Sequence, residues 1–229
     1  SEFKSENSLL GSAYDADSEG FEGKYYIWKF DELENLLEDK FSLFQKKYTI
    51  SKEGNFEGSN ILIEKIETNL LEEELSKIKE LEKLILDKRK RRIKPFFDNK
   101  VQTDLNCYWL YTNLYSSLML NDKDLFLKTT KQIDLLSQKL NKSIFHCYNK
   151  EKKEIDVFLE DYVYFSLLLI ALYEINNDKN SLNRCIELME ETWKLFFNKE
   201  NNLLQKNIIN ANDLFVNPID ISDNNIPNG

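Results

Sequence analysis

The sequence contains few of the residues that shape loop-rich or cross-linked proteins. Its 229 residues include 6 glycines, 3 prolines, 3 cysteines and one histidine. So little glycine and proline argues against a β-sandwich with many turns and favours helices. The three cysteines are odd in number and far apart, which fits neither a disulfide framework nor a CxxC redox or zinc pair. We therefore expect a reducing, cytoplasmic environment for this chain.

A long apolar run and an excess of positive charge are also missing. The longest nearly apolar segment, residues 162–173, is interrupted by Ser166. It is shorter than the roughly 20 residues that a membrane-spanning helix needs. No charged-then-apolar signal peptide opens the chain. The net charge of −9 argues against binding to a nucleic-acid backbone. We expect neither a membrane nor a nucleic acid as a partner.

Helical periodicity dominates the second half of the chain. Apolar stripes predict two pairs of helices, and a short break rich in Asn and Asp joins the helices of each pair. A β-hairpin formed by residues 144–148 and 155–158 is expected between the pairs. A weak strand is expected at residues 203–206. The four predicted helices are residues 104–120, 123–140, 159–175 and 181–197.

The first half mixes short strands with helices. Strands at residues 9–14 and 24–28 are expected to flank an acidic loop, and another is expected at residues 61–63 after a turn at residues 54–58. One helix is predicted to start at Asp31 with a stripe that continues to Phe44. A second helix is predicted to start near Thr68 and to end in the basic run at residues 88–92, before Pro95.

Helix pairs with short connections pack antiparallel. Two such pairs with small β-hairpins at the rim predict a mostly α fold that is part of an α/α toroid. A helical repeat array is the competing architecture. No linker divides the sequence, so residues 1–229 are expected to form one partial toroid domain. A start at Ser1 and a turn-like end at Pro227-Asn228-Gly229 suggest a fragment.

The densest chemical feature is the segment Ser12–Trp28, SAYDADSEGFEGKYYIW. Its three acids, Asp15, Asp17 and Glu19, repel one another unless a cation, a sugar hydroxyl or a backbone N–H uses their charge. A calcium loop would need a bidentate Glu where Tyr26 stands. Two interpretations remain open. In one the acids bind or act on a sugar, and in the other they cap turns, where Asp and Gly are favoured.

Ser12–Trp28 also resembles a family signature, SA-x-DADSEG-x-EGK-[FY]-Y-x-W. Four later segments resemble that family's motifs in the same order: GNFEGSNIL from Gly54, RIKP with DNKVQT from Arg92, FLEDY from Phe158 and DNNIPNG from Asp223. The family is the thioredoxin-domain-containing family of spermatogenesis-associated protein 20. The chain departs from it at Asn99, Leu105 and Cys107, where the family has an acid, Trp and Gly, whereas Asn106 is kept.

This resemblance implies an N-terminal thioredoxin-like domain, which this chain does not contain, followed by a six-hairpin (α/α) toroid like those of glycosidases and sugar epimerases. It implies a carbohydrate-active or carbohydrate-binding toroid without assigning a reaction. The alternative is a non-catalytic platform that supports the attached redox domain. Asn99 and Leu105 favour the platform, and the intact acidic loop favours the carbohydrate function.

The candidate site residues follow from these two lines of argument. The predicted catalytic acids are Asp15 and Asp17, with Asp98 or Asp161 as a second acid. For Asp98 and Asp161 the competing interpretation is a role at the start of a helix. The expected ligand is a small carbohydrate, and neither a metal nor a cofactor is predicted. The predicted ligand-binding residues are Glu19, Tyr25, Trp28, Arg92 and Asn106.

His146 is the only histidine. Epimerases of the toroid type are expected to use two histidines as an acid–base pair, and one histidine cannot supply both groups. Because His146 lies on a predicted strand, the sequence favours an ordinary surface or half-buried side chain over a catalytic one.

Overall fold

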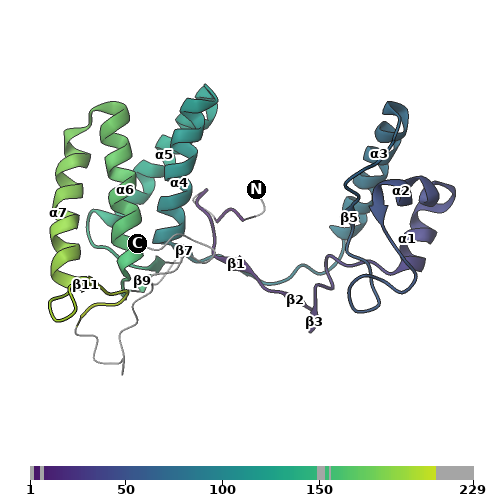
Figure 1. The fold of residues 1–229 in the computed structure, drawn as a ribbon, viewed down its shortest axis with the longest axis horizontal. Coiled ribbons are helices and arrows are strands. Elements are labelled where there is room, and N and C mark those ends of the chain that lie inside the picture. The colour runs from purple at the N-terminus through teal and green to yellow at the C-terminus, as the bar shows by residue number, and fades with distance from the viewer. Residues whose placement is uncertain (1–2, 6–7, 149–152, 155, 210–229) are drawn as a thin grey trace. The chain divides into compact units, whose positions relative to one another are not determined.

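A computed structural model describes residues 3–5, 8–148, 153–154 and 156–209. Contacts within the chain divide it into two compact units (Figure 1). Residues 14–97 form the first, here called the loop unit. Residues 1–13 and 98–229 form the second, here called the helical unit. The chain passes between the units in the short strands β1 (Ala13–Tyr14) and β6 (Phe97–Asp98).

Four helices make up the helical unit. They are α4 (Thr103–Met119), α5 (Lys123–Leu140), α6 (Leu159–Asn176) and α7 (Lys179–Phe196). Helix α4 packs against α5 and α6, and α6 also packs against α7 (Figure 1). The structure thus confirms a mostly helical fold, and all four helices lie within two residues of their predicted bounds.

The turns that join the two helices of each pair have the same Asn-Asp sequence and the same kind of hydrogen bond. Asn121 and Asn177, which follow α4 and α6, adopt left-handed conformations with φ of 52° and 54°. Asparagine tolerates this region better than most residues with a side chain. The next residue, Asp122 or Asp178, accepts a hydrogen bond from a backbone N–H in the first turn of the following helix. Each Asn-Asp pair therefore ends one helix and starts the next.

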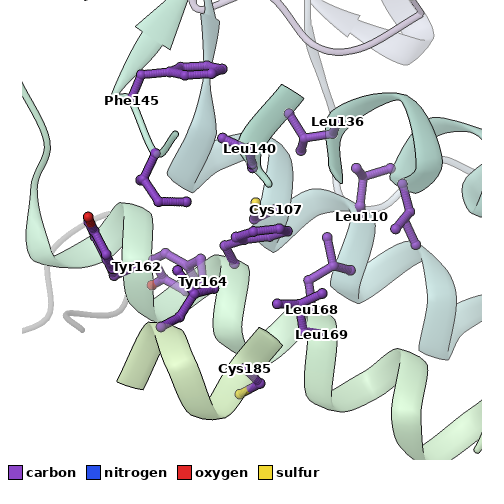
Figure 2. Close-up of a cluster of buried hydrophobic side chains, with 14 of the residues drawn as sticks. Cys107, Leu110, Leu136, Leu140, Phe145, Tyr162, Tyr164, Leu168, Leu169 and Cys185 are labelled. Carbon is purple, nitrogen blue, oxygen red and sulfur yellow. The ribbon is translucent and has the colours of Figure 1, made fainter. Parts of the chain in front are cut away.

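The core of the helical unit lies between these helices. Leu110 of α4, Leu136 of α5 and Leu168 of α6 are fully buried in it (Figure 2). Cys107 and Cys185 are buried in the same core, and Cys147 is buried in a neighbouring strand. Cys107 and Cys185 are free thiols, which agrees with the expectation that the cysteines form no disulfide framework. Within the described ranges, none of the helices combines the length and apolar character that crossing a bilayer requires.

Small strands lie at the ends of the helices. The strands β7 (Val101–Gln102), β8 (Cys147–Tyr148) and β9 (Lys153–Glu154) form an antiparallel sheet in that order. A hairpin therefore exists here, but its first strand is shorter than predicted and its second strand lies at Lys153–Glu154 instead of residues 155–158. Residue 155 lies outside the described residues, and residues 156–158 are not part of the hairpin. The strands β10 (Phe197–Asn198) and β11 (Leu203–Leu204) pair after α7, which confirms strand structure at residue 203.

The loop unit contains the hairpin β2 (Asp17–Ser18)–β3 (Phe21–Glu22) and the pair β4 (Tyr48–Thr49)–β5 (Ile63–Glu64). Its helices are α1 (Phe30–Leu37), the 3₁₀ turn η1 (Glu38–Lys40), α2 (Phe41–Lys47) and α3 (Glu72–Arg89). A core that includes Trp28, Leu33, Phe44 and Ile78 holds these elements together.

Three predictions for the loop unit are wrong in detail. The single helix expected from Asp31 is two helices, because Glu38 has a φ of 49° that interrupts the hydrogen-bond ladder. The helix expected from Thr68 starts at Glu72, where the side chain of Glu74 accepts the N–H of Leu71. The strand expected at residues 24–28 is a turn that ends in a single bridge from Trp28 to Asn60.

Candidate functional site

His146 and Asp161 form a side-chain pair at one end of the helical unit. Asp161 is the third residue of α6, and His146 immediately precedes β8. Thr103, the first residue of α4, fixes the backbone beside His146. Its N–H donates to the carbonyl of His146 at 2.8 Å, and its Oγ1 donates to the carbonyl of Phe145 at 2.7 Å. The pair is therefore held by three elements that are distant in sequence.

The carboxylate of Asp161 is fully buried, at 0% exposure. One oxygen accepts the N–H of Phe158 at 2.9 Å, which is the helix-start role that the sequence offered as one interpretation. The two oxygens also lie 3.1 and 3.2 Å from Nδ1 of His146. Burial raises the pKa of Asp161, while the hydrogen bonds from His146 and the Phe158 N–H partly oppose that shift. Asp161 thus serves the helix and the histidine together.

The second ring nitrogen of His146 lies in a different environment. Its Nε2 is 3.4 Å from the amide nitrogen of Gln102, and the imidazole ring meets Phe158 edge to face. The side chain is 20% exposed. With Nδ1–H donating to an ionised Asp161, Nε2 carries the lone pair and can accept a proton or a hydrogen bond. This is the arrangement in which a buried carboxylate orients a general base.

Asp104 completes the cluster. Ligand atoms of Asp104, His146 and Asp161 all lie within 4.8 Å of one another, so these described residues could also hold a divalent cation. The 3.1 Å contact between Nδ1 of His146 and Asp161 has the length of a direct hydrogen bond. A proton on Nδ1 therefore accounts for this contact.

The raised pKa of Asp161 leads to a prediction for Asp161→Asn. The Asp161 carboxyl keeps its proton up to a higher pH in the folded protein than in the unfolded chain, where the pKa of Asp is about 4. Unfolding then releases protons, so the free energy of unfolding decreases as pH rises from about 4 through the raised pKa. The Asn variant lacks this titration. We expect the stability of the wild type relative to Asp161→Asn to fall over this window.

Urea unfolding of both proteins at a series of pH values measures that difference. Subtracting the variant from the wild type removes the contributions of the carboxylates that they share. A relative stability that increases with pH would mean that protonated His146 stabilises the carboxylate more than burial destabilises it.

The acidic loop lies in the loop unit and folds as a tight hairpin. Asp15, Asp17 and Glu19 are all exposed. The side chain of Asp15 accepts the N–H of Asp17 at 3.1 Å, and Glu19 pairs with Lys24 at 3.1 Å. Glu19 and Gly20 are the two turn residues between β2 and β3, with φ of 55° and 76°. Positive φ at both positions indicates the type I′ turn that favours Gly second.

Arg92 organises the segment that follows the acidic loop. One guanidinium nitrogen donates to the carbonyls of Lys24, Tyr25 and Ile27 at 3.3, 3.1 and 2.7 Å. The other donates to both carboxylate oxygens of Glu32 at 2.9 Å. The guanidinium also lies 3.9 Å from the centre of the Trp28 ring, which is 1% exposed.

These contacts explain why residues 24–28 form no strand. The carbonyls that a neighbouring strand would pair are satisfied by Arg92. Tyr25 and Trp28 are both buried beneath the turn. Their contacts in the described structure are those of packed side chains, and their role as ligand-stacking residues stays a prediction.

Asp98 and Asn106 belong to the helical unit. Asp98 accepts the N–H of Lys100 at 3.1 Å and lies 3.4 Å from its ammonium group. Asn106 is buried and bonds both backbone groups of Leu10, at 2.8 and 3.0 Å, as well as the carbonyl of Gln102. It therefore fastens the N-terminal segment to α4, and Asp98 orders the turn before β7.

The predicted site residues divide between the two units. Six of them belong to the loop unit: Asp15, Asp17, Glu19, Tyr25, Trp28 and Arg92. Asp98, Asn106 and Asp161 belong to the helical unit. Sequence reasoning missed three residues around Asp161: its partner His146, Gln102 beside the second ring nitrogen of His146, and Asp104, the third member of the cluster. The sequence did contain a clue to this pair. The side chain of an acid at the third position of a helix lies close to the residues that precede the helix, and the predicted hairpin places His146 there.

No known protein-family model matches the chain, and no curated protein matches it.

Proposed function

We propose that this chain is part of a carbohydrate-active α/α toroid, and that His146 exchanges a proton with the sugar. The observation that carries the proposal is the fully buried Asp161 carboxylate on Nδ1 of His146, whose side chain is 20% exposed. The carbohydrate class comes from the resemblance to the thioredoxin-domain-containing family of spermatogenesis-associated protein 20. Two antiparallel helix pairs with strands at their ends support the toroid.

The proposed step uses the residues already described. Nε2 takes a proton from a sugar carbon beside the carbonyl of the open-chain form. Nδ1–H stays bonded to Asp161, whose negative charge stabilises the imidazolium that forms. Gln102 lies beside Nε2 and offers an amide to a sugar oxygen. In this proposal Asp98 is a second polar group of the helical unit. Asp15 and Asp17 belong to the loop unit and take no part in this step, so their predicted catalytic role stays a prediction.

Hydrogen–deuterium exchange tests the step directly. The protein is incubated in D₂O with glucose, mannose and N-acetylglucosamine in turn, and loss of the C2 proton signal is followed by NMR. We expect exchange with at least one sugar. We expect His146→Gln to reduce its rate about a hundredfold, the lower end of what a general base contributes. Asp161→Asn should reduce the rate as well, because the ring loses its orienting partner.

Asp124→Asn serves as the matched control, because it removes an acid from the first turn of α5, away from the cluster. This variant should exchange at the wild-type rate. Equal exchange rates in the wild type and His146→Gln would rule out the proposed base. If a chelator abolishes the exchange, the reaction depends on a cation bound by Asp104, His146 and Asp161, and His146 is not the general base.

A non-catalytic platform is the second candidate. The observation that favours it is that the signature residues Arg92, Trp28 and Asp15 make contacts within the loop unit. Cys107 fits this alternative too, since burial, with the nearby charges of Asp161 and Asp104, raises its pKa well above the usual thiol value. The platform predicts no exchange with any sugar and no loss of fold in His146→Gln.

A further inference from the structure

A cavity in the loop unit carries more positive charge than the composition suggests. It has a volume of about 490 Å³ and is formed by the acidic hairpin, the turn after it and the segment that follows α3. Its charged lining consists of Lys24, Lys29, Arg91 and Arg92, together with Glu19 and Glu32. Four cations and two acids thus face one cavity in a chain whose net charge is −9.

The two acids are already neutralised. Glu32 makes a bidentate ion pair with Arg92, and Glu19 pairs with Lys24. Within the described ranges, Lys29 donates only to the neutral carbonyl of Gly58, at 2.9 Å. Among the described residues, the guanidinium of Arg91 has neither an ion-pair nor a hydrogen-bond partner. Two positive charges at the cavity therefore remain uncompensated.

The walls of the cavity are fixed before any ligand arrives. Arg92 is held by three carbonyls, by Glu32 and by the Trp28 ring. Ser18 donates its hydroxyl to the carbonyl of Ile93 at 2.6 Å, which ties the acidic hairpin to the segment after α3. A preorganised wall lowers the cost of ordering side chains on binding.

Tyr25 adds a second, independent observation. It lines the cavity and is 3% exposed, yet its buried hydroxyl has no hydrogen-bond partner in the described part of the chain. An unsatisfied buried hydroxyl costs free energy that a bound acceptor would recover. Tyr25 is thus a buried wall residue of the cavity whose hydroxyl has an unmet hydrogen bond.

From these features we propose that the cavity binds a small organic phosphate monoester. Two uncompensated cations match the charge of a phosphate monoester near neutral pH, and a guanidinium can hold two phosphate oxygens at once. A volume of about 490 Å³ leaves room for an organic part of sugar size beside the phosphate. This site is independent of His146, which lies in the other unit.

Calorimetric titration tests the proposal with glucose 6-phosphate, glucose and inorganic phosphate as probes. We expect glucose 6-phosphate to bind at least tenfold more tightly than either of the others. The double variant Lys29→Gln/Arg91→Gln should weaken that binding about tenfold or more, the value of one lost charge-assisted hydrogen bond. Both side chains are exposed, so the variant should keep its fold, which circular dichroism checks.

Lys83→Gln/Lys88→Gln is the matched control, because it removes the same charge from α3 outside the cavity. It should change the affinity less than threefold. Equal losses in the two double variants, or equal affinities for glucose and glucose 6-phosphate, would overturn the proposal. Inorganic phosphate that binds as tightly as the monoester would overturn the assignment of an organic ligand. His146→Gln should leave phosphate binding unchanged, which separates this result from that of the proposed function.

Discussion

Replacing Gly54 by alanine is expected to destabilise the loop unit by about 3–5 kcal/mol, among the largest effects of a single substitution. Gly54 has a φ of 77° in the turn that precedes Asn60. A Cβ added there would lie 2.5 Å from the backbone nitrogen of Ser59 and closer still to its carbonyl oxygen. These are backbone atoms, so no side-chain rotation relieves the clash, and the turn itself has to move.

Gly20→Ala is the control that separates the steric clash at Gly54 from the cost of placing alanine in a left-handed backbone conformation. Gly20 has nearly the same φ, 76°, and a Cβ there would meet nothing within 4 Å. Only the left-handed conformation is then penalised, by about 1–2 kcal/mol. Urea unfolding of both variants measures the difference. If the two lose equal stability, the close approach of Ser59 to Gly54 is not part of the fold in solution.

Replacing Arg92 by methionine is expected to destabilise the loop unit by about 2–4 kcal/mol. Methionine fills similar space over Trp28 but donates no hydrogen bond. Three carbonyls would lose a donor, and Glu32 would lose its bidentate partner. Arg92→Lys should recover only part of the loss, because one ammonium cannot reach the carbonyls and both Glu32 oxygens together.

The neighbouring Arg91 provides the control for this substitution. Arg91→Met removes the same group from an exposed position without a described partner, so we expect a change of less than about 0.5 kcal/mol. Thermal unfolding followed by circular dichroism compares the three variants. Equal shifts for Arg92→Met and Arg91→Met would contradict the organising role given to Arg92.

The helices of the second half could be predicted from sequence because their determinants are local. Apolar residues form stripes along α5 and α7 and are spread around α4 and α6, and the Asn-Asp breaks lie beside the residues that they terminate. The segment at residues 24–28 could not be predicted in this way. Tyr, Ile and Trp favour strands, but the carbonyls there are taken by Arg92, which lies far along the chain.

The candidate site was only partly predictable for the same reason. Asp161 was identified from a motif and from its place at a helix start. Its partner His146 comes from a hairpin 15 residues earlier, and Thr103 positions that hairpin from a third element. Pairings of this kind depend on tertiary contacts that periodicity does not encode. The positive charge of the cavity in the loop unit could not be predicted either, because the net charge of a sequence does not show which acids are paired with which cations.

The two Asn-Asp turns, Asn121-Asp122 and Asn177-Asp178, also affect how the helical unit folds. Each reverses the chain within a few residues, so α4 meets α5, and α6 meets α7, across very short loops. Short loops lose little entropy on closure, and contacts that are near in sequence form fast. Each hairpin can therefore form early by itself. We expect the docking of α4 on α6, which also brings Thr103, His146 and Asp161 together, to be the slower step.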